Sequence, residues 1–264
     1  MKVAVHGIDG KRTGEIELGK AFSNKTRADL VLRAFLAERS QKRQAYGADP
    51  LAGKRTSAHY HGERGGRWAM MNKEMARSKR IHNQGNLNYT ARFVPQAVKG
   101  RATHPPKAEK VWELKINKKE KVKALLSALS ATTDKSLVIN RGHQVNGSSV
   151  PLVFDDKLEE LKTTKKLVEL LISVGLEKEL ERGKKKNVRA GKGKVRGRKY
   201  KKKKSLLIVV KDDKGIGKAA RNIAGVDVTE TKCLTVSLLA PGGTAGRLTL
   251  FTKSALEELN KLEA

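Results

Sequence analysis

The sequence predicts an α/β protein: a three-layer globular domain around a mostly parallel sheet, interrupted by a long extended non-globular loop and by a basic segment. Two observations predict this. Short aliphatic runs alternate with stretches of helical periodicity, which is typical of a sheet covered by helices on both faces. The positive charge is concentrated in two stretches with few aliphatic residues. We expect 1–45 and 105–264 to form the domain, containing the basic segment 182–204, and 46–104 to form the loop.

The first 45 residues have the pattern of a hairpin followed by a helix. Residues 3–6 and 15–18 alternate as short strands on either side of a glycine-containing turn. Thr26, with Asp29 three residues later, resembles a capping box, and the apolar residues that follow recur at helical spacing. We therefore expect a helix from there to about Ala45.

The segment after the loop alternates between helical and aliphatic patterns. Asn117 marks the expected start of a helix. The run 136–140 predicts a buried strand, and the apolar stretch 150–154 predicts another. A helix from about Thr164 should end near Gly175, because glycine adopts the left-handed cap conformation at least cost.

The C-terminal part repeats this alternation. The aliphatic run 206–210 predicts a strand, and a helix should begin at about Gly217. Further strands are expected at 234–239 and 247–251. A last helix is expected after Ser254, whose hydroxyl is a suitable N-cap.

The net charge indicates a polyanionic partner. The chain has 264 residues and a formal charge of +30. Residues 182–204 hold 14 Lys or Arg and no acid, and residues 46–104 hold 11 Lys or Arg against 3 acids, so these two stretches carry +22 of the total. A folded protein tolerates such self-repulsion best beside nucleic acid. A single basic run could be a solvated linker or a nuclear-localisation patch, but two long runs favour nucleic-acid binding.

The loop 46–104 has a composition that cannot fold alone. It contains five Val, Ile or Leu and seven Gly among 59 residues, too little apolar surface to offset the entropy of ordering. Each limb has about thirty residues and, at about 3.3 Å per residue, could reach on the order of 100 Å. Aromatic residues interleave with the basic ones and could stack on bases; they are Tyr60, Trp68, Tyr89, Phe93 and Tyr200.

One glycine pattern resembles part of a dinucleotide-binding turn. Gly215-x-Gly217-x-x-Ala220 follows an aliphatic strand, so an RNA-modifying enzyme that uses a nucleotide cofactor is an alternative function. Four polar residues separate the strand from Gly215, however, where the fingerprint turns at once. A flexible helix-entry turn is the preferred interpretation. The single cysteine, Cys233, has no neighbouring ligand and is expected to be a small buried apolar residue.

Metal binding, catalysis and membrane insertion are not expected. His59-x-His61 supplies two candidate ligands, but no Cys, Asp or further His lies close in sequence, and a metal site needs three or four ligands. We find no nucleophile elbow, phosphate loop or zinc-protease motif. No aliphatic run is long enough to cross a bilayer. The sequence therefore predicts a non-enzymatic protein with no cofactor and no metal.

Several segments resemble one known family. The run 92–106 (RFVPQAVKGRATHPP) closely resembles the returning limb of the long loop in the large-subunit ribosomal protein four family, archaeal and eukaryotic branch. The run 239–255 (LAPGGTAGRLTLFTKSA) is similar to the C-terminal signature of the same family. Shorter segments at 127–132, 140–143 and 190–198 also resemble it, so the resemblance covers essentially the whole chain.

The resemblance implies a structural role in the ribosome. The domain would lie on the outer face of the large subunit, bind large-subunit rRNA and support subunit assembly. The loop would reach the wall of the peptide exit tunnel, beside large-subunit protein twenty-two, near the nascent polypeptide. The expected location is the cytoplasmic ribosome. A protein that compacts nucleic acid without specificity is a further alternative, since the charge pattern alone also fits it.

Two sets of site residues follow from the resemblance and the charge pattern. The expected tunnel-proximal tip comprises Lys54, Arg55, Thr56, Ser57, Ala58, His59, Tyr60, His61, Arg64, Gly65 and Gly66. The expected rRNA-binding residues of the loop are Arg67, Arg77, Lys79, Arg80, Arg92, Gln96, Lys99, Arg101 and His104. Those of the basic segment are Lys184, Lys185, Lys186, Arg189, Lys192, Lys194, Arg196, Arg198, Lys199, Lys201, Lys202, Lys203 and Lys204.

Overall fold

The computed structural model describes residues 1–145 and 149–261 and divides into two compact units. Met1–Lys42 and Glu113–Ala264 make the first, called here the globular unit, and Arg43–Trp112 makes the second, called the arm. Each unit has its own buried residues and is described separately below.

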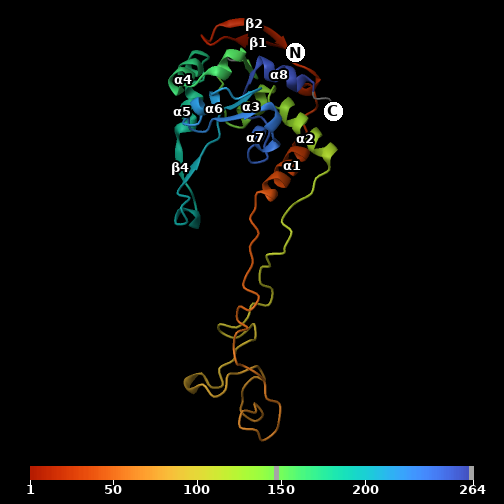
Figure 1. The fold of residues 1–264 in the computed structure, drawn as a ribbon, viewed down its shortest axis with the longest axis vertical. Coiled ribbons are helices and arrows are strands. Elements are labelled where there is room, and N and C mark those ends of the chain that lie inside the picture. The colour runs from red at the N-terminus through yellow and green to blue at the C-terminus, as the bar shows by residue number, and fades with distance from the viewer. Residues whose placement is uncertain (146–148, 262–264) are drawn as a thin grey trace. The chain divides into compact units, whose positions relative to one another are not determined.

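A six-stranded sheet forms the centre of the globular unit (Figure 1). The strand order is β2-β1-β3-β8-β6-β7, in which β1 and β2 pair antiparallel and all other neighbours pair in parallel. The strands are β1 (Lys2–His6), β2 (Arg12–Glu17), β3 (Leu152–Phe154), β6 (Leu207–Val210), β7 (Asp227–Glu230) and β8 (Thr249–Thr252). This confirms the predicted mostly parallel α/β sheet.

Helices cover both faces of the sheet. Side chains of β6 alternate between two apolar clusters: Leu207 and Val209 enter one, and Ile208 and Val210 enter the other. The expected three layers are thus confirmed. The helices are α1 (Ala28–Gln41), α2 (Lys118–Ser130), α3 (Lys135–Asn140), α4 (Thr164–Ser173), α5 (Glu177–Lys184), α6 (Ile216–Ala220), α7 (Val236–Leu239) and α8 (Lys253–Asn260).

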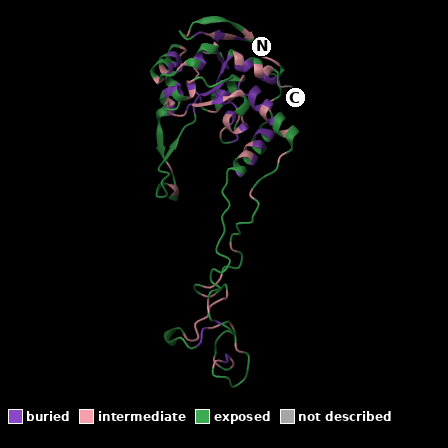
Figure 2. Cartoon of the chain, viewed as in Figure 1, coloured by how far each residue is buried: buried purple, intermediate pink, exposed green. Residues whose placement is uncertain are grey.

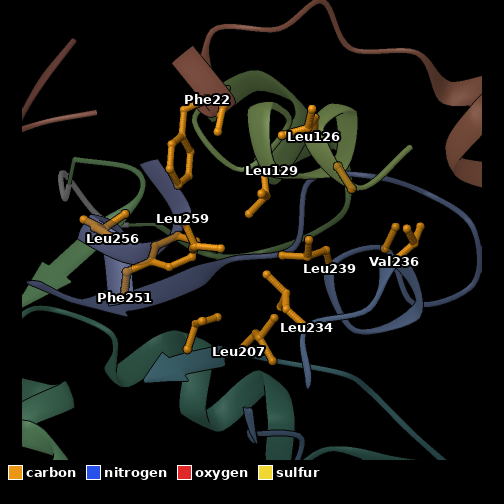
Figure 3. Packing of buried hydrophobic residues seen from close by; sticks show 14 of the residues in the cluster. Phe22, Leu126, Leu129, Leu207, Leu234, Val236, Leu239, Phe251, Leu256 and Leu259 are labelled. Atoms are coloured by element: carbon orange, nitrogen blue, oxygen red, sulfur yellow. The ribbon is translucent and has the colours of Figure 1, made fainter. Parts of the chain in front are cut away.

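The first apolar cluster joins α1, α2, α7 and α8 to one face of the sheet. Figure 3 shows Phe22 pointing toward Phe251 of β8, and the two rings meet edge to face with centroids 5.6 Å apart. Leu129 of α2 and Leu256 of α8 complete this part of the core and are fully buried. Burial of one such side chain contributes about 1.5–3 kcal/mol.

The second apolar cluster lies on the opposite face. It includes Leu167 and Leu171 of α4 and Phe154 of β3, all fully buried. The helix α4 ends as expected, because Gly175 adopts a positive φ of 86° directly after it.

A two-stranded hairpin extends from the globular unit and carries most of the basic segment. Its strands are β4 (Lys186–Val188) and β5 (Tyr200–Lys202), paired antiparallel with Lys186 opposite Lys202. Every residue of both strands is exposed, which Figure 2 shows in green. Because the hairpin has no apolar face to bury, it contributes positive charge and adds no residue to the apolar core.

The predicted strand at 136–140 is wrong: these residues form α3. The Asp134 carboxylate accepts hydrogen bonds from the Ser136 amide (2.9 Å) and hydroxyl (2.7 Å), which caps the helix. Val138 is fully buried while Ile139 is 49% exposed, so the run has one buried side. A short apolar run does not distinguish a strand from a buried helical turn, and here the cap decides.

The predicted strand at 234–239 is also wrong, since α7 occupies most of it. The amides of Val236 and Ser237 donate to the Glu38 carboxylate of α1 at 3.2 and 2.9 Å, which favours a helical turn. The strand of this region is β7, whose polar sequence DVTE gave no aliphatic signal. Cys233 is exposed, so the expectation that it is buried was also wrong.

Helix ends differ from the sequence pattern in two places. The helix α1 begins at Ala28 and ends at Gln41, and the Arg27 amide donates to the Ser127 hydroxyl of α2 at 2.6 Å where a capping box was expected. The cap of α8 is Thr252, whose hydroxyl accepts from the Ala255 amide, and not Ser254. Both starts depend on tertiary neighbours.

The arm consists of two limbs and a small folded end. The limbs lie against each other where the Ala48 amide donates to the Pro106 carbonyl at 2.8 Å. The positive φ of 72° at Gly53 and its close approach to the Arg101 backbone leave no room there for a side chain. The buried residues of the folded end are Ala58, Ala69, Met70, Ile81 and His82.

No helix within the described residues is long and apolar enough to cross a membrane.

Candidate nucleic-acid interface

A cationic hollow of about 610 Å³ lies at the base of the β4–β5 hairpin. All of its ionisable lining residues among the described part of the chain are basic, which suits an anion such as phosphate. The lining residues are Arg141, Gly142, His143, Arg182, Asn187, Lys201, Lys202, Lys203, Lys204, Pro241, Gly242 and Thr244.

A buried carboxylate fixes one wall of the hollow. Glu179 of α5 is 1% exposed and accepts hydrogen bonds from Nε and Nη2 of the Arg182 guanidinium, at 2.8 and 2.7 Å. The Ser205 hydroxyl and the Gln144 amide donate to it at 2.7 and 3.0 Å. Burial opposes ionisation of Glu179, but these bonds and the one from His143 outweigh it and lower its pKa to about 2. Glu179 is therefore ionised at neutral pH.

His143 belongs to the same network. Its Nδ1 lies 2.8 Å from the Glu179 carboxylate, and its side chain is 1% exposed. Burial lowers the pKa of His143, although the contact with Glu179 acts in the opposite direction. The net positive charge of the hollow therefore comes mainly from its arginines and lysines.

Arg141 connects the hollow to the C-terminal part of the chain. Its guanidinium donates to the Thr244 hydroxyl at 2.6 Å and also to the carbonyls of Thr244 and Pro241. Burial, followed by repulsion from Arg247 and Arg182, lowers the pKa of Arg141 to about 10, so it stays charged at neutral pH. Arg141 thus links two segments that lie about a hundred residues apart in the sequence.

A second, fully buried arginine supports the base of the hairpin. Arg247 is 1% exposed and donates to the Ser205 and Leu238 carbonyls at 2.8 and 2.9 Å and to the Asp227 carboxylate at 2.6 Å. Lys204 also bonds Asp227, at 2.9 Å. Arg247 therefore holds the point at which the basic segment enters β6.

Arg141, Arg182 and Arg247 were not predicted individually as functional residues, although Arg182 begins the basic segment. Arg141 and Arg247 do lie in segments that resemble the ribosomal family, and those segments were the available signal. Charge density pointed instead to 182–204, whose predicted RNA-binding residues are all exposed except the half-buried Arg189. The structure places Lys201–Lys204 and the two lining arginines around one hollow.

The predicted RNA-binding residues of the arm fall into two groups. Arg80 and Arg92 are half-buried and donate to backbone carbonyls, Arg80 to Tyr89 at 2.6 Å and Arg92 to Val98, so they brace turns of the arm. Arg101 is half-buried as well. The exposed group is Arg67, Arg77, Lys79, Gln96, Lys99 and His104.

Cations already cover several aromatic rings of the arm. Lys79 lies 4.4 Å from the ring centre of Phe93, and Lys73 lies 4.7 Å from that of Tyr89. Tyr60, at the predicted tip, is 43% exposed. Rings of the arm thus have both basic neighbours and partly open faces, a combination suited to stacking on bases.

A third histidine joins His59 and His61 in space, although none lies close to them in sequence. His82 lies with them, and one ligand atom from each of the three lies within 4.8 Å of the others. Burial, and then repulsion from His61 and His59, lowers the pKa of His82. The sequence separation of 21 residues gave no signal for this cluster.

The Gly215 turn is not arranged to hold a nucleotide. The amides of Gly215 and Gly217 both donate to the Asp213 carboxylate at 3.0 Å, so the chain's own anion occupies the place that a pyrophosphate would need. The helix α6 that follows spans only Ile216–Ala220. The turn is a carboxylate-capped helix start.

Comparisons with known proteins identify the family of the chain. The model of the ribosomal protein L4/L1 family matches residues 16–262. Large ribosomal subunit protein uL4 of Methanococcus aeolicus is 46% identical over 263 residues, covering 99% of each chain. The uL4 proteins of Methanocaldococcus jannaschii and Methanosphaera stadtmanae are 45% and 44% identical, covering 99% of this chain and 99% and 97% of theirs. The chain therefore belongs to the ribosomal protein L4/L1 family, a non-enzymatic family of the large ribosomal subunit.

Proposed function

We propose that this ribosomal protein binds large-subunit rRNA through two surfaces, the hollow with its β4–β5 hairpin and the arm. The observation that carries the proposal is that every ionisable residue lining the hollow, among the described residues, is basic, and that its arginines are held in place by Glu179 and by backbone carbonyls. Guanidinium groups fixed in this way can bind phosphate without losing much side-chain entropy. The exposed lysines of the hairpin extend the same positive surface.

The arm is proposed to order fully only against RNA. Six non-glycine residues of the arm have positive φ between 52° and 62°, a conformation that costs about 1 kcal/mol or more each and needs support from the surroundings. Only five side chains of the arm are buried, and two of them are alanines. These residues are Asn72, Glu74, Asn83, Tyr89, Phe93 and Lys99.

By the family resemblance, the end of the arm lines the peptide exit tunnel. The residues from Lys54 to Gly66 would approach the nascent polypeptide, next to large-subunit protein twenty-two. Apart from the buried Ala58 and the half-buried Thr56 and His61, this stretch is exposed, as a lining surface requires. The protein would act in the cytoplasmic ribosome and support subunit assembly.

Charge-matched lysine variants test the proposal. Lys201, Lys202 and Lys203 are changed together to Gln, and the control changes Lys118, Lys119 and Lys121 of α2, which are equally exposed but belong to neither surface. Each lost phosphate contact should reduce the salt slope of RNA affinity by about 0.7–0.9. We therefore expect a slope reduced by about 2–3 for the hairpin variant and little change for the control.

The binding assay uses large-subunit rRNA and, in parallel, duplex DNA of equal length. Equal slopes for the two triple variants would contradict a role for the hairpin surface. Equal affinity of the wild type for RNA and DNA would instead favour the nucleic-acid-compacting alternative, in which charge alone determines binding.

A further inference from the structure

Three histidine side chains converge at the folded end of the arm. The ring centres of His59 and His61 are 4.3 Å apart, and His82 lies 4.9 Å from the first and 4.7 Å from the second. One nitrogen from each ring lies within 4.8 Å of the others. Three converging imidazoles are a ligand set that transition-metal sites use.

Backbone pairing brings the three residues together. His59 and Arg80 form an antiparallel bridge, in which the His59 amide donates to the Arg80 carbonyl at 3.2 Å and the Arg80 amide returns a bond of 3.1 Å. His61 follows two residues after His59, on the same side of an extended segment, and His82 follows two residues after Arg80. The cluster is therefore set by main-chain hydrogen bonds within the arm.

The hydrogen bonds of the rings leave nitrogens available for a metal. The Nδ1–H of His59 donates to the Ser57 carbonyl at 3.0 Å, which fixes the ring and leaves Nε2 with its lone pair. His82 is 8% exposed, and neither of its ring nitrogens has a hydrogen-bond partner of normal geometry among the described residues. The His59 backbone lies close to the His82 ring but makes no hydrogen bond of normal geometry to it. A buried imidazole without a partner destabilises the folded state unless something binds it.

An aromatic wall holds His82 in position. The ring of Trp68 lies 4.8 Å and that of Tyr89 6.3 Å from the ring of His82. The Tyr89 hydroxyl donates to the Arg67 carbonyl at 3.0 Å and accepts from Lys73 at 2.8 Å. The wall restricts the His82 ring, so this one ligand is largely preorganised.

We propose that His59, His61 and His82 bind one divalent transition-metal ion of the zinc class, with a fourth position open to water or to an anionic oxygen. Tetrahedral Zn²⁺ with ligands at about 2.0–2.1 Å needs nitrogens about 3.3 Å apart. The ligand nitrogens now lie within 4.8 Å of one another, so the most widely separated pair has to approach by at most about 1.5 Å. His59 is exposed and His61 half-buried, so rotation of these two side chains can supply that movement.

Such an ion would join two stretches of a segment that has almost no apolar core. It would connect residues 57–61 to residues 80–82, and metal binding by a poorly stabilised segment contributes directly to its folding. The ion would thus order the end of the arm in the absence of RNA. The inference concerns the arm alone and does not depend on the rRNA-binding proposal.

Zinc titration of the full-length chain, prepared without a histidine tag and stripped of metal, tests the proposal. Zn²⁺ is added in competition with a chromophoric chelator. We expect one ion per chain for the wild type. His82→Phe keeps a ring against Trp68 but removes the ligand, and it should weaken binding more than about tenfold, the least that loss of an outer-shell partner costs. His104→Phe, at an exposed histidine of the same arm, is the matched control and should bind as the wild type does.

A second variant and a second measurement distinguish the loss of a metal ligand from misfolding of the arm. His59 is exposed, so His59→Ala should leave the arm folded while also weakening Zn²⁺ binding more than about tenfold. Added Zn²⁺ should slow amide exchange at 57–61 and 80–82 in the wild type and in His104→Phe, but not in His82→Phe or His59→Ala. Absence of stoichiometric binding by the wild type, or equal binding by wild type and both ligand variants, would overturn the proposal.

Discussion

Single ionised residues, buried and fully hydrogen-bonded, fix the geometry of the hollow. Glu179 is the clearest case, because one carboxylate receives bonds from Arg182, His143, Ser205 and the Gln144 amide. Buried charges stabilise a fold only when their partners are complete, and removing one partner leaves an uncompensated charge. Removal of a single partner from this network is therefore expected to destabilise the folded state.

Acid should destabilise the globular unit through Glu179. Its pKa falls from an ordinary 4.5 to about 2 on folding, so the ionised form stabilises the folded state above pH 4.5, and this contribution is lost as the pH falls from 4.5 toward 2. The difference is equivalent to about 3 kcal/mol. Glu179→Gln should lose a similar amount at pH 7 and should flatten this acid limb. Urea unfolding against pH measures both effects.

Glu177 provides the matched control for this measurement. It lies in the same helix but is exposed, so Glu177→Gln should keep the acid limb of the wild type. A wild-type stability that stays constant between pH 4.5 and 2 would refute the role assigned to Glu179. His143 adds to the same trend at higher pH, because a lowered histidine pKa also makes the folded state lose stability as pH falls below about 6.5.

Among the helices and strands, the sequence correctly predicted those whose conformation is determined by residues within the element itself. The run Leu207–Val210 is aliphatic throughout and forms the interior strand β6, buried on both faces, as expected. The segments that were assigned wrongly depend on residues elsewhere. The turn α7 is capped by Glu38, about 200 residues away, and β7 is polar because it lies at the edge of the sheet. No local pattern contains that information.

The helix α3 should depend on its cap. Asp134→Ala removes the acceptor for the Ser136 amide and hydroxyl and should cost about 1 kcal/mol. Asp212→Ala, an exposed carboxylate in the loop before α6, should cost less than about 0.5 kcal/mol. Thermal unfolding of both variants checks the assignment. Equal losses of stability in the two variants would mean that the Asp134 cap is not the reason why residues 136–140 are helical.

The Gly215 turn should not bind nucleotide. A ligand at one hundred times its dissociation constant adds about 2.7 kcal/mol to stability, which a melting curve detects. We expect no shift with a dinucleotide or a methyl donor, because Asp213 already holds both glycine amides. A reproducible shift in the wild type that Gly217→Ala abolishes would revive the enzyme hypothesis.

For the whole molecule too, features encoded in a local stretch of sequence could be predicted, and features that need distant residues to meet could not. Charge and composition indicated a long basic loop, because its lack of aliphatic residues is visible in any window of the sequence. The hollow was not foreseeable, since Arg141, Arg182 and Thr244 meet only through the fold. The histidine cluster needs the His59–Arg80 bridge, which composition does not encode.

Deleting the arm should leave the globular unit folded. Replacement of residues 48–102 by a short Gly/Ser bridge removes residues of the arm only, and neither apolar cluster of the sheet includes any of them. We expect a melting temperature within a few degrees of the wild type, together with weaker RNA binding. A chain that fails to fold would show that the arm stabilises the globular unit.

Amide exchange of the full-length protein, free and bound to large-subunit rRNA in metal-free buffer, tests the central claim most directly. The account predicts rapid exchange across 46–104 and across the β4–β5 hairpin in the free chain, because few buried side chains protect them. Both segments should become protected when RNA binds, while strands β6 and β8 stay protected throughout. Unchanged exchange of both segments on RNA binding would contradict the account.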